Sequence, residues 1–402
     1  MDILSELTLP ETWQAFLTYK TEKQSLSKEE AERIRSLLAD GVCARAALLS
    51  DSDFVPPLPY KKEISKEGSE KKRTVYCYPE EFQIFLKLIA FLLYRYDSVF
   101  SENCYAFRRQ LGVSDAIRRL RRGKGVSQKY CLKVDIHNYF NSVSVPLLLE
   151  KLRFLEESDA PLYRLFSKLL TADACLEDGI AVPEKRGAMA GIPVAPFFAN
   201  AYLSCVDAEF ARKGSLYFRY SDDILLFADS PKELSGLQEL LYLRLSEHSL
   251  TLNPQKVRLS KPGEPIEFLG FSYRDGEMDL SPNTLRKTKA KIRRKARALR
   301  RWQNKKGLSG EKAAKGFIHA MNRKFYADRN PDAFTWSRWF FPNLTTAKGL
   351  AEIDACMQQY IRYAATGKHS KSNYRIRYDT LKEWGYRSLV HEYYAIRKDT
   401  SL

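Results

Sequence analysis

The sequence has few of the groups that build disulfide frameworks or zinc sites. Its 402 residues include seven cysteines, an odd number, and contain no Cys-x-x-Cys pair. Paired cysteines mark secreted scaffolds and zinc sites, so we expect buried thiols in a reducing compartment. The five histidines are scattered, which argues against a zinc nuclease of the HNH type. They are His137, His248, His319, His369 and His391.

Long hydrophobic runs are also lacking. The longest apolar stretch covers residues 84–94, is interrupted by Lys87, and is too short to cross a bilayer. The first residues show no signal-peptide pattern. We therefore expect a soluble, cytoplasmic protein with no membrane partner.

Acidic residues are in deficit, with 49 acidic against 66 basic side chains and a formal net charge of +17. Such an excess is the electrostatic footprint of a partner that carries many phosphates. Ribosomal and membrane-surface proteins share this balance, so charge alone assigns no function. The 44% hydrophobic content is enough for a sizeable core in two or three subdomains.

The deficit of acids is most pronounced over residues 283–305. Ile292, Ala296 and Leu299 recur there at helical spacing and predict a basic helix with a narrow apolar face. A solvated surface is the usual explanation of a charged run, but the lack of acids favours contact with a nucleic-acid backbone. The candidate contacts are Arg286, Lys287, Lys291, Arg294, Arg297 and Arg301.

Two adjacent acids, Asp222 and Asp223, stand between the apolar, β-prone segments 218–221 and 224–227. Adjacent carboxylates repel each other, and a core gains nothing from them, whereas a hard divalent cation binds such oxygens. A third acid, Asp135, follows another apolar strand-like run. An isolated Asp-Asp pair is usually a solvated turn, but three acids so placed favour two-metal phosphoryl transfer.

These residues belong to a series of motifs in family order. Tyr220-Ser221-Asp222-Asp223 resembles the YxDD box of reverse transcriptases, with Ser in the variable position. Neighbouring stretches between about residues 70 and 275 resemble the other motifs of that family. They are Lys71 to Val75, Asn103 to Arg108, Asp135 to Phe140, Gly187 to Leu203, Leu252 to Lys256 and Phe268 to Phe271.

This resemblance implies an α+β, right-hand polymerase fold and RNA-directed DNA polymerase activity. It predicts N-terminal helices and fingers over 1–128, a palm of antiparallel sheet and helices with interleaved fingers elements over 129–275, and a basic, helical thumb with a C-terminal extension over 276–402. Asp135, Asp222 and Asp223 would hold two Mg²⁺ ions, with Mn²⁺ as an alternative. The carbonyl of Val134 or Ile136 would complete the shell.

The resemblance also assigns roles around the incoming nucleotide. Arg73 and Arg108 match positions that contact the triphosphate, with Lys71 and Lys72 as further candidates. Phe140 matches an aromatic gate that excludes the 2′-hydroxyl, although it could be an ordinary core residue. Lys256 matches a lysine that protonates the leaving pyrophosphate, and a plain surface lysine is the alternative.

Two further segments complete the predicted site. Ala190 stands where retroviral and group II intron enzymes carry Gln, a departure that affects fidelity and template handling. Gly187 and Gly191 would allow close backbone approach to a nucleotide. Phe268, Leu269 and Gly270 resemble the primer grip, although FLGF is also a common apolar strand.

The C-terminal stretches 363–369 and 385–390 resemble the thumb extension of bacterial defence-associated reverse transcriptases, formerly the unknown group within the group II intron and retron-like enzymes. Type 2 is the favoured subtype. This implies that the chain copies a structured non-coding RNA into cDNA from dNTPs in antiphage defence. A retron-like or CRISPR-associated enzyme and a catalytically silent RNA-binding scaffold are the alternatives. The oligomeric state is left open.

The local patterns predict four further elements. Residues 74–78 are expected as a strand, 80–97 as a helix, and 114–122 as a helix with a basic face. The Lys- and Glu-rich stretch from Tyr60 to Gly68 is expected as a loop.

Overall fold

The computed structural model describes residues 1–22, 26–65, 72–185, 187–326 and 335–399. Lys71, one of the predicted triphosphate contacts, lies outside the described residues.

The described chain forms two compact units. The larger comprises Met1–Glu22, Leu26–Ala116 and Gln128–Pro262, and the smaller contains Ile117–Ser127 and the chain from Gly263 onward. The predicted division into three domains at 128 and 275 remains a prediction.

The larger unit contains most of the helices. They are α1 (Ile3–Glu6), α2 (Pro10–Glu22), α3 (Lys28–Ala39), α4 (Val42–Ala46), α5 (Glu80–Leu92), α7 (Tyr139–Ser142), α8 (Val145–Lys151), α9 (Phe154–Ser158), α10 (Ala160–Thr171), α11 (Ala195–Tyr202), α12 (Ser204–Arg212) and α13 (Pro231–Glu247). One basic helix, α6 (Val113–Arg122), shares residues with both units. The short 3₁₀ helices of the two units together are η1 (Ala47–Ser50), η2 (Leu93–Val99), η3 (Val126–Gln128), η4 (Pro254–Lys256), η5 (Phe341–Asn343) and η6 (Lys371–Arg375). Of these, η5 and η6 belong to the smaller unit.

The strands form three sheets. They are β1 (Tyr60–Ser65), β2 (Lys72–Cys77), β3 (Tyr130–Asp135), β4 (Ala174–Glu177), β5 (Ile180–Pro183), β6 (Tyr217–Tyr220), β7 (Asp223–Ala228), β8 (Arg258–Ser260), β9 (Ile266–Phe268), β10 (Phe271–Arg274) and β11 (Glu277–Leu280).

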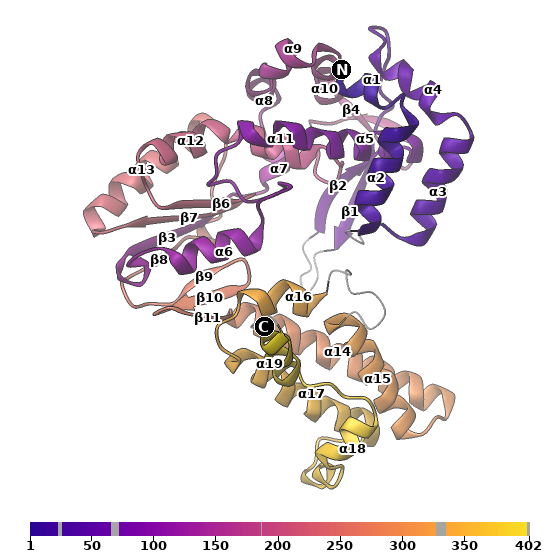
Figure 1. Cartoon of the computed structure of the whole chain (residues 1–402), viewed down its shortest axis with the longest axis vertical. Helices are drawn as coiled ribbons and strands as arrows, with labels where there is room; N and C mark the ends of the chain where they lie inside the picture. Colours follow the sequence, from indigo (N-terminus) through magenta and orange to yellow (C-terminus); the bar gives the residue numbers. More distant parts are fainter. Residues whose placement is uncertain (23–25, 66–71, 186, 327–334, 400–402) are drawn as a thin grey trace. The chain divides into compact units, whose positions relative to one another are not determined.

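The sheet that carries the three acids has the order β6-β7-β3-β8, and each neighbouring pair is antiparallel. Its central strands β7 and β3 consist mainly of apolar residues, and Leu132, Val134 and the residues from Ile224 to Ala228 are buried. Helix α13 packs against β3 and β7 (Figure 1). This is the antiparallel palm sheet that the motifs predicted.

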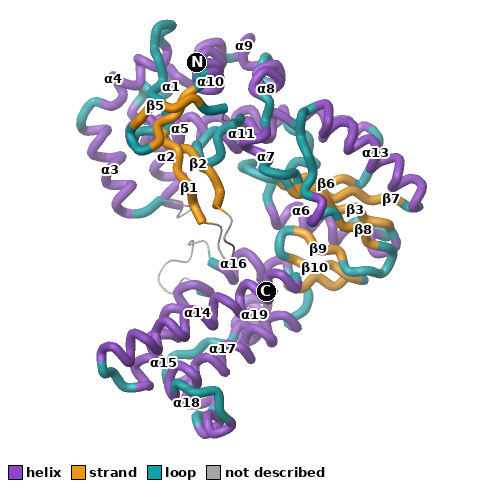
Figure 2. Tube along the Cα trace, turned by 180° about the vertical axis from the view of Figure 1, so that it is seen from behind, coloured by secondary structure: helices purple, strands orange, loops and turns teal. Residues whose placement is uncertain are grey.

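A second sheet of the larger unit has the order β2-β1-β4-β5. The loop expected from Tyr60 to Gly68 is wrong over Tyr60–Ser65, which form β1, and residues 66–68 lie outside the described residues. Nearly all side chains of β1 are exposed, so it lacks the apolar alternation that marks a strand. Antiparallel pairing with β2 and the 2.8 Å ion pair of Lys61 with Glu184 hold it instead. Figure 2 shows this sheet and the palm sheet as separate groups of strands, with α7 and α11 between them.

The larger unit has one continuous hydrophobic core. It runs from the N-terminal helices through α5, α10 and α11 to the inner face of the palm sheet. The expected helix over 80–97 is present as α5 followed directly by η2. The core thus supports β3 and β7, whose ends carry the acids.

The smaller unit consists of the three-stranded sheet β11-β10-β9 and a group of helices. They are α14 (Pro282–Lys306), α15 (Gly310–Phe325), α16 (Trp336–Phe340), α17 (Lys348–Thr366), α18 (Tyr378–Glu383) and α19 (Leu389–Asp399).

The predicted basic helix is confirmed as α14. The Ser281 hydroxyl caps its first turn by accepting from Thr284 N–H at 3.2 Å, and Gly307 ends it at φ +62°. Ile292 and Ala296 are fully buried, and α14, α15 and α17 pack against one another. Across the described ranges, no helix is both long and apolar enough to span a bilayer.

Candidate active site

The tight turn between β6 and β7 presents the Asp-Asp pair. Tyr220 pairs with Asp223, so Ser221 and Asp222 form the turn itself. Ser221 has φ +60°, a left-handed conformation that is uncommon outside glycine. Strain of this kind persists only where surrounding contacts hold it, and it gathers at functional sites.

The structure places the three predicted acids at neighbouring backbone positions. Asp135, the last residue of β3, lies directly opposite Asp223 in the β3–β7 register. The Ile136 N–H donates to the Asp222 carbonyl at 3.0 Å, which fixes the turn beside the end of β3. The end of β3 and the neighbouring β6–β7 turn therefore place all three acids at the same end of the central strands of the palm sheet.

Two lysines neutralise this cluster. Lys256 Nζ lies 2.5 Å from Asp135 Oδ2, and Lys133 Nζ lies 3.5 Å from Asp223 Oδ1. Lys256 ends η4, which follows Asn253, and the Asn253 N–H donates to the Asp135 carbonyl at 2.9 Å. Lys256 was predicted, whereas Lys133 was missed. Its signal was the period of two along a strand, which puts residues 133 and 135 on one face.

The electrostatics of the turn favour a bound cation. Burial raises the pKa of the Asp222 carboxyl, and the nearby Asp135 charge raises it further. Burial also raises the pKa of Asp223, while Lys133 opposes that shift. A positive charge beside these three acids lowers the free energy of the charged carboxylates.

The donor set fits a hard divalent cation, because it consists of carboxylate oxygens from three neighbouring backbone positions. Within the described residues, no three His, Cys, Asp or Glu side chains already converge as metal ligands. In the structure, Asp135 and Asp223 face lysine ammonium groups instead.

Aromatic rings border the site. Phe140 is partly buried in α7, five residues after Asp135. Its ring centroid lies 6.2 Å from that of Phe107, which in turn lies 6.4 Å from that of Tyr220. Phe107 was missed as a site residue, although it is 41% exposed and has φ +59°. A left-handed backbone cannot be read from sequence unless the residue is Gly or Asn.

The glycines of the 187–191 loop make close contacts within the protein. A Cβ on Gly187 would lie 2.7 Å from the Phe140 carbonyl oxygen, and one on Gly191 would lie 2.8 Å from the Tyr76 carbonyl oxygen. Ala190 is 2% exposed, and its carbonyl accepts from Tyr76 N–H at 2.7 Å. The loop therefore packs closely against β2 and α7, and a side chain at either glycine would collide with their backbone. This is a different reason for glycine from the predicted close approach to a nucleotide.

The two predicted triphosphate arginines differ in setting. Arg73 is exposed on β2, where it pairs with Ile64 of β1. Arg108 directs its guanidinium at backbone carbonyls, with Nη1 2.8 Å from the Ser101 oxygen and Nη2 2.6 Å from the Asp97 oxygen. These contacts hold the loop before Arg108, and its role toward a triphosphate remains a prediction.

In the smaller unit, the predicted primer-grip residues form the tight turn between β9 and β10. Leu269 has φ +51° and Gly270 has φ +91°, and the Gly270 carbonyl accepts from Thr284 Oγ1 at 2.8 Å. This hydrogen bond connects the turn to the first turn of α14. The role of the β9–β10 turn toward a primer remains a prediction.

The candidate phosphate contacts lie along α14. Lys291 is partly buried, and the others are exposed. The exposed ones are Arg286, Lys287, Arg294, Arg297 and Arg301.

Comparisons with known proteins agree with the motif series. Residues 64–273, just over half of the chain, match the family described as reverse transcriptase (RNA-dependent DNA polymerase). The chain is similar to the Retron Ec86 reverse transcriptase of Escherichia coli, with 23% identity over 171 residues, 42% of this chain and 49% of that protein. It is also similar to Protein P of Heron hepatitis B virus, with 29% identity over 122 residues, 29% of this chain and 15% of that protein. The chain thus spans half or less of the length of these relatives.

Solved structures with a related backbone include two yeast telomerases. That of Candida albicans, in complex with a fragment of telomeric RNA, aligns with a TM-score of 0.46 at 13% identity over 86% of this chain and 67% of that chain. The apo enzyme of Candida tropicalis gives 0.47 at 11% identity over 83% and 70%. The family match and the antiparallel palm sheet confirm the predicted α+β, right-hand polymerase fold. Because the family model matches more than half of the chain, the chain belongs to the reverse transcriptase family, and the three acids at the end of β3 and at the β6–β7 turn lie within the matched residues.

Proposed function

We propose that the chain is an RNA-directed DNA polymerase that adds deoxynucleotides by two-metal nucleotidyl transfer. The observation that carries this proposal is the register of β3 against β7, which sets Asp135 opposite Asp223 beside the Asp222 turn. The segment that contains these residues is the one that matches the family.

The acids Asp135, Asp222 and Asp223, with the Ile136 carbonyl, would hold two Mg²⁺ or Mn²⁺ ions. When bound, such ions stabilise the charge that develops on the attacking and leaving oxygens. Lys256 holds an ammonium proton at the cluster, within 2.5 Å of Asp135 Oδ2, and would donate it to the leaving pyrophosphate.

Other residues of the site would select and hold the substrate. Phe140 would pack under the sugar and exclude the 2′-hydroxyl. Arg73 and Lys72 would reach the triphosphate, since both side chains are exposed on β2. Arg108 remains a candidate for the same task.

The direct test is primer extension on an RNA template with a DNA primer, dNTPs and Mg²⁺. We expect full-length DNA that disappears with EDTA and returns with added Mg²⁺ or Mn²⁺. Purified protein that binds the primer–template duplex without extending it under any of these conditions would favour the RNA-binding scaffold instead.

We further propose that the template is a structured non-coding RNA and that the cDNA serves antiphage defence. The resemblance of the C-terminal stretches to defence-associated enzymes and the excess of basic residues support this proposal. The similarity to a retron enzyme supports a retron-like role as the second candidate. Sequencing of nucleic acid that co-purifies from the native host, with and without phage, separates the two by the identity of the RNA.

A further inference from the structure

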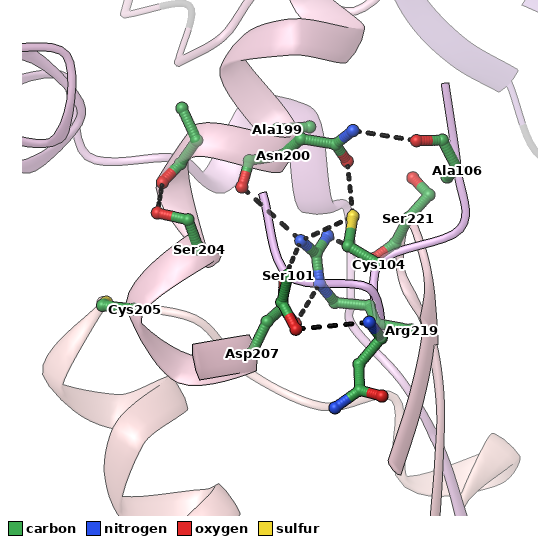
Figure 3. A network of polar contacts seen from close by, with 12 residues as sticks. Ser101, Cys104, Ala106, Ala199, Asn200, Ser204, Cys205, Asp207, Arg219 and Ser221 are labelled. Carbon is green, nitrogen blue, oxygen red and sulfur yellow. Dashed lines mark hydrogen bonds and ion pairs between the residues drawn. The ribbon is translucent and has the colours of Figure 1, made fainter. Parts of the chain in front are cut away.

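A fully buried ion pair lies directly behind the Asp-Asp turn. Arg219, in β6, and Asp207, in α12, are both 0% exposed. Arg219 donates through Nε to Asp207 Oδ1 at 2.8 Å and through Nη2 to Oδ2 at 2.5 Å (Figure 3). The Tyr217 hydroxyl donates to Asp207 Oδ1 at 3.0 Å.

Stability alone explains this pair poorly. Desolvation of two charges can exceed their attraction, and well-packed apolar residues in place of a buried pair are often as stable or more so. The other contacts of the Arg219 guanidinium, beside the Asp-Asp turn, therefore offer a better reason for the buried pair than stability does.

The rest of the guanidinium contacts the turn and its support. Nη1 lies 3.4 Å from the carbonyl oxygen of Ser221, the turn residue with left-handed φ. Nη2 also lies 3.2 Å from Cys104 Sγ and 3.5 Å from the Asn200 carbonyl oxygen. One planar group thus connects α12 and α11 with the residue next to Asp222.

The backbone of Arg219 and the side chain of Asn200 hold the segment that leads to Phe107. The Arg219 N–H donates to the Asn103 carbonyl at 2.8 Å, and the Tyr105 N–H donates to the Arg219 carbonyl at 2.9 Å. Asn200 Nδ2 donates to the Ala106 carbonyl at 2.8 Å. The exposed Phe107 ring therefore starts from a backbone that these hydrogen bonds hold.

We propose that Arg219 and Asp207 are positioning residues for nucleotide addition, which set the Ser221–Asp222 turn relative to Asp135. This inference rests on the proposed polymerase function. Arginine suits the task because its fork can bind both carboxylate oxygens and still offer a donor to a carbonyl, which an ammonium group cannot do in one fixed geometry. A shift of about 1 Å in a reacting centre can lower a rate by ~10²-fold.

The decisive variant replaces both charges, Arg219→Met with Asp207→Leu. Because apolar residues can fill the space, we expect its midpoint of thermal unfolding to stay within a few degrees of the original. We expect kcat to fall by ~10²-fold, with the KM for dNTP changed far less. Equilibrium binding of Mn²⁺, measured by electron paramagnetic resonance without nucleotide, should weaken as well.

The chain offers a matched control. Arg244 and Glu209 also form a bidentate pair, at 2.6 Å and 3.1 Å, between α13 and α12 and without contact to the turn. Arg244→Met with Glu209→Leu should leave kcat and Mn²⁺ binding unchanged.

Loss of kcat and of Mn²⁺ binding at a preserved unfolding midpoint supports the proposal. A folded double variant whose kcat and Mn²⁺ affinity equal those of the unsubstituted protein overturns the proposal. If that variant unfolds, Arg219→Lys, tested below its own unfolding midpoint, decides in the same way, since it retains the charge but not the fork. An original protein without primer extension would instead refute the polymerase function, and the Mn²⁺ titration would still report on the turn.

Discussion

The turn between β6 and β7 and the surface of α14 use charge in opposite ways. At the turn, the three acids are buried or partly buried, Lys133 is partly buried and Lys256 is 46% exposed, and each lysine pairs with one of the acids. Along α14, most basic side chains are exposed on a regular helix. Buried charges interact strongly and depend on geometry, whereas exposed charges are screened and act together. Single substitutions should therefore be decisive at the turn and graded on α14.

The largest effect is expected from Asp222→Ala with Asp223→Ala. Nucleotide incorporation should fall by ~10³-fold or more, because metal binding contributes several kcal/mol to stabilising the transition state. Binding of RNA, measured by fluorescence anisotropy, should change little. Asp229→Ala, directly after the other end of β7, is the matched control. Undiminished incorporation by the double variant would contradict the assignment of the site.

The next largest effect is expected from Lys256→Ala. Loss of the proton donor should lower kcat by ~10²-fold while the KM for dNTP stays nearly constant. Pre-steady-state incorporation of a single nucleotide measures this step. Lys129→Ala, whose ion pair with Asp229 lies at the far end of the same strands, should be near the original rate. Equal rates for the two variants would reduce Lys256 to a surface lysine.

Phe140→Val tests selection of the sugar. Removal of the ring should lower the preference for dNTP over rNTP by about tenfold or more, measured as the ratio of the two kcat/KM values. Phe154→Val, another partly buried ring of the larger unit, is the control. If the ratio stays constant, Phe140 is an ordinary packing residue.

The smallest single effects are expected on α14. Each of Lys287→Gln, Arg297→Gln and Arg301→Gln should weaken RNA binding modestly and reduce the slope of log K against log salt by up to about 1. The three together should add these changes while kcat at saturating template stays constant. Lys315→Gln, on α15, serves as the control. A loss of kcat from a single α14 variant would break the contrast between the two regions.

The sequence predicted the palm sheet and α14, and it marked the three acids and Lys256 as site residues, whose roles remain predictions, because each rests on a local pattern or on a motif of contiguous residues. It did not predict β1, whose exposed residues are held by pairing with β2. Lys133, Phe107 and the Arg219–Asp207 pair were also missed, since their roles depend on neighbours that are distant along the chain. The left-handed backbone of Phe107 and Ser221 has no signature in residue type.

The register of β3 against β7 has a consequence for how this chain can change in length. Side chains alternate between the faces of a strand, so one residue inserted into β3 would turn Asp135 to the other face of the sheet and set a different residue opposite Asp223. Exposed turns between β3 and β6, such as the β4–β5 turn at Asp178 and Gly179, carry no such restriction, because additions to a surface loop cost little. Variation should therefore accumulate as whole loops between the two strands, while the strands keep their residue count.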